Sequence, residues 1–282
     1  MLNRTFFRAV GAVFIALASA TSAADSRIVS AGSAVTELVF ALEQQQQLVA
    51  VDVTSSLPAE MTLPKIGYHR QLSAEGILAL GPNRIIGSDE MGPQTTLSQL
   101  RSAGVAVDIV NSEPTAQGLI KRIEQIAQLT GAETQGEALT QQVSQQIARL
   151  QANQSNNSLS AKKVLFLLLH EGRPANVAGA QTTPNAIVEL AGGINPAADT
   201  ITSYKPLSTE ALVQMQPDII LVSGRSYDKL GGADAILEKM PMLAATPAGK
   251  NKRLIQIDGR ALVGGLGLKS LAEAERLSAL ID

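Results

Sequence analysis

The sequence predicts an α/β protein of two lobes with mostly parallel sheets, joined by a single long helix. Three observations predict this architecture. Short apolar runs rich in β-branched residues alternate with helix-like stretches, which is typical of βα units. The alternation occurs twice, once on each side of a long amphipathic pattern. The run Val164–Leu169 has no polar alternation, as expected for a strand in a sheet buried on both faces.

The chain begins with a segment that we interpret as a secretory signal peptide, residues 1–24. A basic start is followed by the apolar run Ala9–Ala18 and then by small residues that end at Ala24. We expect cleavage after Ala24, with cleavage after Ala20 as the alternative. The apolar run is too short to span a bilayer, which needs about 20 residues. The sequence contains no Cys, which excludes lipoprotein processing.

The first lobe is predicted over residues 25–131. Its expected strands are Ile28–Val29, Leu48–Val53, Arg84–Gly87 and Val105–Val110. Its expected helices are Ala34–Leu42, Ser73–Leu80 and Gln94–Ala103. The order βαβα predicts a mostly parallel sheet with helices on its faces, a Rossmann-like arrangement.

A linking helix and loop are predicted over residues 132–160. Gly131 ends one helical pattern, and the next has four apolar residues at spacings that place them on one helix face: Leu139, Val143, Ile147 and Leu150. A helix of about 20 residues is about 30 Å long. It therefore predicts a stiffer connection than a linker rich in glycine and serine would give.

The second lobe is predicted over residues 161–282, again as alternating strands and helices. The expected strands are Val164–Leu169, Asp218–Val222 and Leu254–Ile257, and the expected helices include Asn185–Ala191 and Thr209–Met215. This second α/β set predicts a second Rossmann-like lobe.

An internal repeat relates the lobes. The segment Leu72–Ser88 aligns without gaps to Leu207–Ser223, with six identical residues. Each copy predicts a capping serine, a short helix, a turn with proline and a strand, and each has a tyrosine just upstream, Tyr68 or Tyr204. Chance similarity between two βα units is the alternative, but the matched glutamates favour pseudo-symmetry.

Composition and missing motifs exclude several classes of function. The 23 basic and 25 acidic residues do not give the basic face of a nucleic-acid binder. The lack of Cys excludes disulfide frameworks, Cys zinc sites, iron–sulfur clusters and thiol nucleophiles. Nucleophile-elbow, zincin and phosphate-loop motifs are absent, and the glycine-rich Gly264–Ser270 is better explained as a turn before the last helix. We therefore expect no enzyme and no catalytic cofactor.

Two groups of polar residues are candidates for a ligand site. Tyr68, His69 and Arg70 are consecutive in a loop before the helix predicted at Ser73. His170 stands at the carboxyl end of a predicted buried strand, where open α/β sheets place their ligands. Taken alone, Tyr68 is better explained as an ordinary surface-loop tyrosine and His170 as the capped end of a strand. Together they predict a site in a cleft between the lobes.

The segment Gly67–Leu78 resembles the motif of periplasmic heme-binding proteins of bacterial hemin ABC importers. The similarity extends over nearly the whole mature chain, including Ser30–Leu38, Val177–Gly179, Gly231–Asp234 and Thr246–Gly249. The resemblance implies a class III substrate-binding protein, monomeric and periplasmic, with ferric heme in the interlobe cleft as its transported ligand. It further implies delivery to an inner-membrane ABC permease dimer with a cytoplasmic ATPase.

The resemblance also implies roles for single residues. Tyr68 matches the axial heme ligand, and a phenolate suits ferric iron because both are hard. Arg70 is then a contact of the phenolate or of a heme propionate. His170 matches a possible second ligand, whereas His69 falls where the family varies and is expected to pack or to hydrogen-bond. Further possible cleft contacts come from the second lobe: Arg173, Tyr204, Arg225 and Tyr227.

Glu75 and Glu210, the glutamates matched in the repeat, correspond to the pair that docks such carriers on the permease. Stabilisation of a helix start by a first-turn carboxylate is the simpler alternative. Two other functions stay open. One is a carrier of cobalamin or a ferric siderophore, for which a chain without Trp offers few aromatic walls. The other is a secreted enzyme that uses carboxylates, which has no positive support in the sequence.

Overall fold

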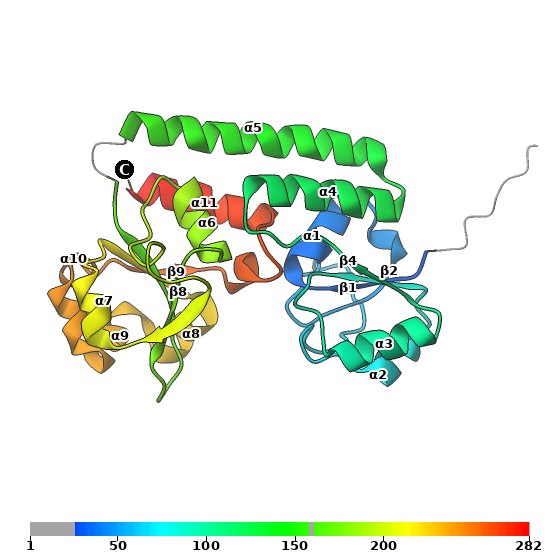
Figure 1. Cartoon of the computed structure of the whole chain (residues 1–282), viewed down its shortest axis with the longest axis horizontal. Coiled ribbons are helices and arrows are strands. Elements are labelled where there is room, and N and C mark those ends of the chain that lie inside the picture. Colours follow the sequence, from blue (N-terminus) through cyan, green and yellow to red (C-terminus); the bar gives the residue numbers. More distant parts are fainter. Residues whose placement is uncertain (1–25, 158–160, 282) are drawn as a thin grey trace, which may run out of the picture.

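The computed structural model describes residues 26–157 and 161–281, so the predicted signal peptide lies outside the described residues. Two lobes lie side by side beneath the long helix α5, Glu133–Asn157 (Figure 1). Within the described part of the chain, no helix is both long and apolar enough to cross a membrane.

The first lobe has a four-stranded sheet that is parallel throughout, in the order β2-β1-β3-β4. Its strands are β1 (Ile28–Ala31), β2 (Leu48–Val51), β3 (Arg84–Gly87) and β4 (Ala106–Ile109). Its helices are α1 (Ser33–Ala41), α2 (Ala74–Leu78), α3 (Gln94–Ser102) and α4 (Ala116–Thr130), with the short 3₁₀ helix η1 (Gln45–Gln47) before β2. The elements predicted for this lobe are confirmed, with ends that differ by a few residues.

The second lobe has a five-stranded mixed sheet in the order β7-β6-β5-β8-β9. The strands β5 (Val164–Leu168), β8 (Ile219–Ser223) and β9 (Leu254–Ile257) are parallel and were predicted. The antiparallel strands β6 (Ala175–Ala178) and β7 (Tyr204–Leu207) were not. Pro206 within β7 argues against a strand in the sequence, but proline is tolerated here because β7 is at the sheet edge.

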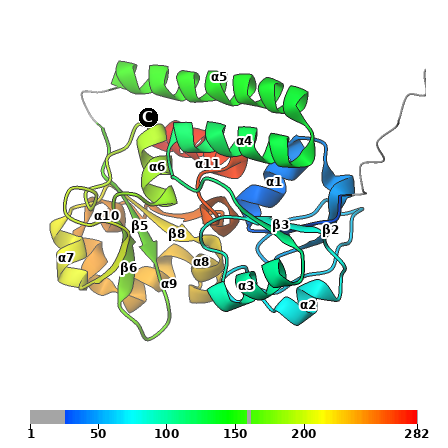
Figure 2. The ribbon, with the colours of Figure 1, turned by 45° about the vertical axis from the view of Figure 1, so that its right-hand side comes forward.

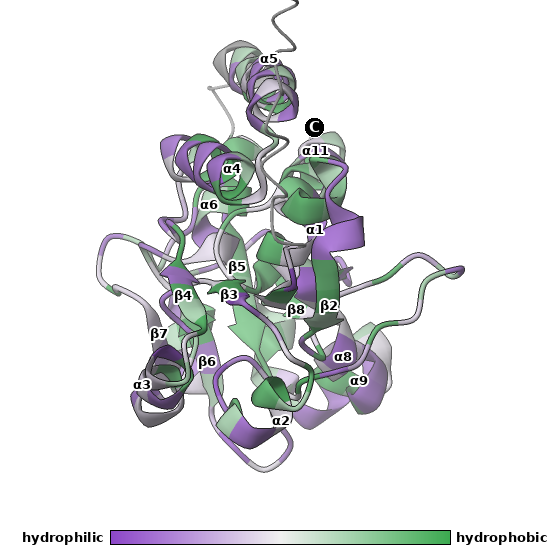
Figure 3. Ribbon diagram, turned by 90° about the vertical axis from the view of Figure 1, so that its right-hand side faces the viewer, coloured by the Kyte–Doolittle hydropathy of each residue, from purple (hydrophilic) through white to green (hydrophobic). Residues whose placement is uncertain are grey.

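Helices surround this second sheet on both faces (Figure 2). They are α6 (Thr183–Leu190), α7 (Thr209–Gln214), α8 (Gly224–Leu230), α9 (Gly232–Lys239), α10 (Pro247–Lys250) and α11 (Leu268–Ile281), with the 3₁₀ helices η3 (Pro241–Ala245) and η4 (Gly259–Leu262). Figure 3 shows hydrophobic strands in the interior and hydrophilic residues on outer helices such as α3 and α9.

The two copies of the sequence repeat have the same local structure. The side chain of Ser73 accepts a hydrogen bond from the N–H of Gly76 at 3.3 Å and caps α2. The side chain of Ser208 accepts one from the N–H of Ala211 at 3.3 Å and caps α7. Each helix is followed by a strand, β3 or β8. The predicted correspondence of these units is therefore confirmed.

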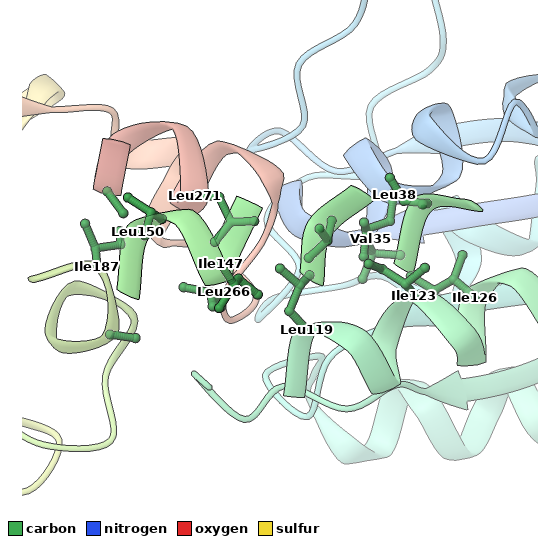
Figure 4. Packing of buried hydrophobic residues seen from close by; sticks show 14 of the residues in the cluster. Val35, Leu38, Leu119, Ile123, Ile126, Ile147, Leu150, Ile187, Leu266 and Leu271 are labelled. Atoms are coloured by element: carbon green, nitrogen blue, oxygen red, sulfur yellow. The ribbon is translucent and has the colours of Figure 1, made fainter. Parts of the chain in front are cut away.

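One apolar core runs beneath α5 and includes residues of both lobes. The four residues predicted on one face of α5 are buried: Leu139, Val143, Ile147 and Leu150. Figure 4 shows Ile147 and Leu150 near Leu266, Leu271 and Ile187, and the first-lobe residues Leu119 and Ile123 farther along the same layer. The lobes are thus joined by a helix and also by a shared core.

A buried ionic group, here called the junction cluster, lies where the C-terminal segment returns to the first lobe. It consists of Glu37 on α1, Arg122 on α4 and Lys269 on α11. Arg122 is 0% exposed and donates from Nη1 to the carbonyl oxygen of Leu266 at 2.6 Å. The carboxylate of Glu37 accepts from the backbone N–H of Lys269 at 3.2 Å. The junction cluster therefore connects helices of both lobes.

The glycine-rich turn before α11 fits this cluster closely. Gly265 has a φ of +90°, and a Cβ there would lie 2.2 Å from Nη2 of Arg122. A Cβ on Gly267 would lie 2.0 Å from Oε1 of Glu37. The turn predicted here is confirmed, and its glycines are needed for the close approach of buried charged side chains.

Candidate functional site

The loop that carries Tyr68, His69 and Arg70 is tied to the carboxyl ends of two parallel strands. The N–H of Val53, after β2, donates to the carbonyl of Gly67 at 2.9 Å. The N–H of Gly92, after β3, donates to the carbonyl of His69 at 3.0 Å. Open parallel sheets place ligand sites at this edge.

Exposure alternates along the loop. The side chains of Tyr68 and Arg70 are 41% and 53% exposed, whereas that of His69 is 1% exposed. The rings of Tyr68 and His69 meet edge to face, with their centroids 4.4 Å apart. The loop therefore presents a phenol and a guanidinium outward and anchors itself through an imidazole.

His69 belongs to a chain of alternating charges, here called the His69 cluster: Asp52, His69, Glu90 and Arg70. Nδ1 of His69 is 3.0 Å from Oδ2 of Asp52, which is fully buried. Nε2 of His69 is 3.3 Å from Oε2 of Glu90, an ionic contact poorly aligned for a hydrogen bond. Nη2 of Arg70 contacts the other oxygen of Glu90. The cluster runs from the sheet edge to the surface.

The electrostatics of the His69 cluster favour its charged forms. Burial would lower the pKa of His69, but its contacts with Asp52 and Glu90 outweigh burial and raise that pKa. Burial would raise the pKa of each carboxyl group, yet contact with His69 contributes most to lowering both. These shifts favour an imidazolium between two carboxylates.

Hydroxyl groups anchor the buried end of the cluster. Ser55 donates to Oδ1 of Asp52 at 2.6 Å, and Thr54 donates to Oδ2 at 2.7 Å. The hydroxyls of Ser55 and Thr36 are 2.7 Å apart, and those of Thr36 and Ser30 are also 2.7 Å apart. Asp52 is therefore fixed to β1 and α1.

Residues of the second lobe face this cluster. Tyr204, on β7, is 40% exposed and its ring packs on Phe166. Burial, reinforced by the negative charge of Glu90 and opposed by Arg70, raises the pKa of Tyr204 to about 12. The backbone N–H of Gly264 also bonds to Glu90 and helps to lower the pKa of that carboxyl. The predicted Tyr68 loop therefore lies close to the second lobe.

The other predicted contacts are distributed over the second lobe. His170 and Arg173 are exposed in the hairpin between β5 and β6. Arg225 is exposed on α8, whereas Tyr227 is half-buried against the apolar core of its own lobe. Tyr68, His69 and Arg70 thus share one loop, and the charges of Arg70 and Glu90 act on the pKa of Tyr204 across the lobes. The ligand roles of all the predicted site residues stay predictions.

Glu75 and Glu210 occupy matching places in the two lobes. Both are exposed in the first turn of a short helix, α2 or α7. Hydrogen bonds from its own backbone N–H and from Ser208 lower the pKa of Glu210. Both carboxylates are therefore accessible to a partner, and Glu210 also stabilises its helix start.

Sequence reasoning missed Asp52 and Glu90. Asp52 fell inside the predicted strand Leu48–Val53, whereas β2 ends at Val51 and Asp52 directly follows it. Glu90 comes three residues after β3, so the carboxyl end of that strand was the signal available. In the described ranges, 26–157 and 161–281, no three His, Asp or Glu side chains gather in a way that could hold a metal ion.

Comparison with known proteins adds a family and several relatives. A family model described as "Periplasmic binding protein" matches residues 28–261. The periplasmic heme-binding protein HutB of Vibrio cholerae is 61% identical, with a TM-score of 0.86, and the match covers 91% of this chain and 98% of that one. The periplasmic heme-binding protein BhuT, solved with two hemes, is 33% identical, with a TM-score of 0.79, over 91% and 99% of the chains.

Relatives with another ligand are also found. The vitamin B12-binding protein of Pectobacterium atrosepticum is 27% identical over 221 residues, which cover 78% of each chain.

Proposed function

The chain belongs to the periplasmic binding protein family, and from this premise we propose that it is a periplasmic carrier of ferric heme. In this proposal the protein captures heme between its two lobes and delivers it, chemically unchanged, to an ABC transporter of the inner membrane. The observation that carries the proposal is the 61% identity to a periplasmic heme-binding protein over nearly its full length.

Tyr68 is the proposed axial ligand of the heme iron. A porphyrin supplies the equatorial nitrogen ligands itself, so one side chain from the protein is sufficient. The hydroxyl of Tyr68 is on an exposed ring whose backbone is fixed to β2 and β3. Ferric iron is a hard cation and a phenolate is a hard anion, so a tyrosine oxygen suits this metal as a ligand.

The second lobe supplies the remaining contacts in this proposal. Tyr204, whose pKa responds to the charges of Glu90 and Arg70, is the proposed packing contact of the porphyrin. His170 is the proposed second ligand or a cap on a second heme, and Arg173, Arg225 and Tyr227 are further possible contacts. The endpoint of a hemin titration gives the number of hemes bound.

A carrier of cobalamin is the second candidate, because the curated relatives at 27% identity include a vitamin B12-binding protein. The exposed Tyr68 beside Arg70 favours heme, since cobalt in cobalamin already has a bound nitrogen base and gains little from a phenolate. The two ligands are separated by direct titration.

The test is to titrate the mature protein with hemin and, separately, with cyanocobalamin. We expect a high-spin ferric tyrosinate spectrum with hemin, its loss in Tyr68→Phe, and its retention in the matched variant Tyr204→Phe. The proposal would be overturned if the protein bound cyanocobalamin and the Soret band of hemin did not change on titration with the protein. Loss of the tyrosinate spectrum in Tyr204→Phe but not in Tyr68→Phe would make Tyr204, in the second lobe, the iron ligand and would contradict the role of Tyr68.

Export and delivery are separate parts of the proposal. Residues 1–24 are the proposed signal peptide, to be checked by sequencing the N-terminus of exported protein. Glu75 and Glu210 are the proposed contacts with a permease dimer. Replacing both by alanine should abolish stimulation of the transporter ATPase and leave hemin affinity unchanged. Loss of hemin binding in that variant would instead point to a role of the two carboxylates in folding or in the pocket.

A further inference from the structure

Arg70 already has a carboxylate partner within the protein. Its guanidinium contacts Oε1 of Glu90, and the two side chains are 53% and 33% exposed. A planar guanidinium recognises carboxylates in general, whether they belong to the protein or to a ligand. Glu90 therefore binds the guanidinium of Arg70, which a carboxylate of an arriving ligand would also bind.

Glu90 has two further partners that do not depend on Arg70. Nε2 of His69 is 3.3 Å from its second oxygen, and the N–H of Gly264 bonds to the carboxylate from the other lobe. Both contacts help to lower the pKa of Glu90. Its negative charge consequently stays compensated when Arg70 turns away.

Arg70 is the member of the His69 cluster that is free to turn. More than half of its side chain is exposed, so its reorientation uncovers little buried surface. By contrast, His69 and Asp52 are almost completely buried. The cluster thus has a fixed end and one movable cation, and the movable cation lies two residues from Tyr68.

We infer that Glu90 is an internal substitute for a carboxylate of the ligand: it holds Arg70 in the ligand-free protein and releases Arg70 to a porphyrin carboxylate when the ligand binds. The inference rests on the proposed heme-binding function and goes beyond it, because it makes Glu90 a residue that sets affinity and selects porphyrins with free carboxylates.

The experiment measures the affinity of hemin and of hemin dimethyl ester for the wild type, Glu90→Gln, Arg70→Gln and the double variant. Glu90→Gln should bind hemin about fivefold more tightly, because a half-exposed ion pair contributes at most about 1 kcal/mol. Its affinity for the dimethyl ester should not change. In the Arg70→Gln background, Glu90→Gln should have no effect on hemin.

A matched control separates exchange of partners from simple charge removal. Asp89→Asn removes a negative charge one residue away, at a side chain that pairs with Ser112 and not with Arg70. It should tighten hemin binding less than Glu90→Gln does. Thermal melting of each variant reports whether the fold is intact.

Two results would overturn the inference. Equal tightening by Glu90→Gln with and without Arg70 would show a general field effect. Equal weakening for hemin and its dimethyl ester would show that Glu90 only positions His69. Failure of the proposed function looks different, since the wild type would then bind neither porphyrin.

Discussion

The junction cluster and the His69 cluster both hold charged side chains away from water, but they differ in where they end. The junction cluster is closed around Arg122, which is 0% exposed and donates to a carbonyl of the turn before α11, and around Glu37, which is 11% exposed; Lys269, 34% exposed, is its outer member. The His69 cluster is open: it begins at the buried Asp52 and ends at Arg70, which is 53% exposed.

This difference indicates that the junction cluster serves the packing of the two lobes, whereas the His69 cluster is available for ligand binding. Breaking a closed ionic group leaves an uncompensated buried charge, which is costly, so its contacts fix how the helices of the two lobes meet. An open group can exchange its outermost partner at little cost, so its contacts are available to a ligand. We therefore expect substitutions at the junction to change stability most, and substitutions at the open end to change ligand affinity most.

The largest expected effect is that of Arg122→Met. The substitution removes the donor to Leu266 and leaves Glu37 without a nearby cation from α4, so we expect a loss of about 3–5 kcal/mol in the free energy of unfolding. Urea unfolding measures it. The matched variant Arg149→Met, on the exposed face of α5, should change the free energy by less than about 0.5 kcal/mol. Equal effects of the two would contradict a structural role for the junction.

A somewhat smaller loss is expected from Gly265→Ala. Alanine is strained at a φ of +90°, and its Cβ would lie 2.2 Å from Arg122. Gly131→Ala is the control, because its φ is +70° and nothing lies within 4 Å of the added Cβ. We expect about 1 kcal/mol for the control and about 3 kcal/mol at Gly265, by chemical denaturation. Equal losses at the two sites would show that the side chain of Arg122 can move away from the added Cβ without loss of stability, and that the junction cluster is not tightly packed.

Glu37 gives the junction a dependence on pH. Burial raises its pKa from 4.5 to about 7, although Lys269 and Arg122 face it from α11 and α4 and oppose the shift. Between those two values the folded state binds the proton more tightly than the unfolded chain, so stability falls as pH rises.

The wild type should therefore lose about 2 kcal/mol more than Glu37→Gln between pH 5 and pH 8, as measured by urea unfolding at each pH. The exposed Glu137→Gln should retain the pH profile of the wild type. Parallel profiles for the wild type and Glu37→Gln would show that Glu37 does not titrate in this window.

The sequence predicted those elements whose pattern is local. Every strand of the first lobe, and β5, β8 and β9 of the second, is a mainly apolar run rich in β-branched residues or leucine, which can be recognised without knowing its neighbours. The strands β6 and β7 could not be read in this way. Asn176 interrupts β6, Lys205 and Pro206 interrupt β7, and pairing with a neighbouring strand defines both.

The same distinction applies to the candidate site. Tyr68, His69 and Arg70 are consecutive, so a motif found them. Asp52 and Glu90 lie 17 residues before and 21 residues after His69, and only the parallel order of β2, β1 and β3 brings them to it. The junction cluster joins residues far apart in the sequence, because the turn before α11 packs against α1 and α4. The glycines of that turn are the only sequence signal for this contact.

The smallest effect on stability is expected from Glu90→Gln, the substitution for which we propose an effect on ligand affinity. Glu90 is 33% exposed and its partner Arg70 is 53% exposed, so Glu90→Gln should lower the free energy of unfolding by less than about 1 kcal/mol. The amide keeps the shape of the side chain and an oxygen acceptor for the N–H of Gly264. The exposed ion pair Lys252–Asp234 is the control, and Asp234→Asn should give a change of similar size. A loss at Glu90 as large as that of Arg122→Met would mean that the His69 cluster is as closed as the junction, and its outer carboxylate would then not be free to exchange Arg70 with a ligand.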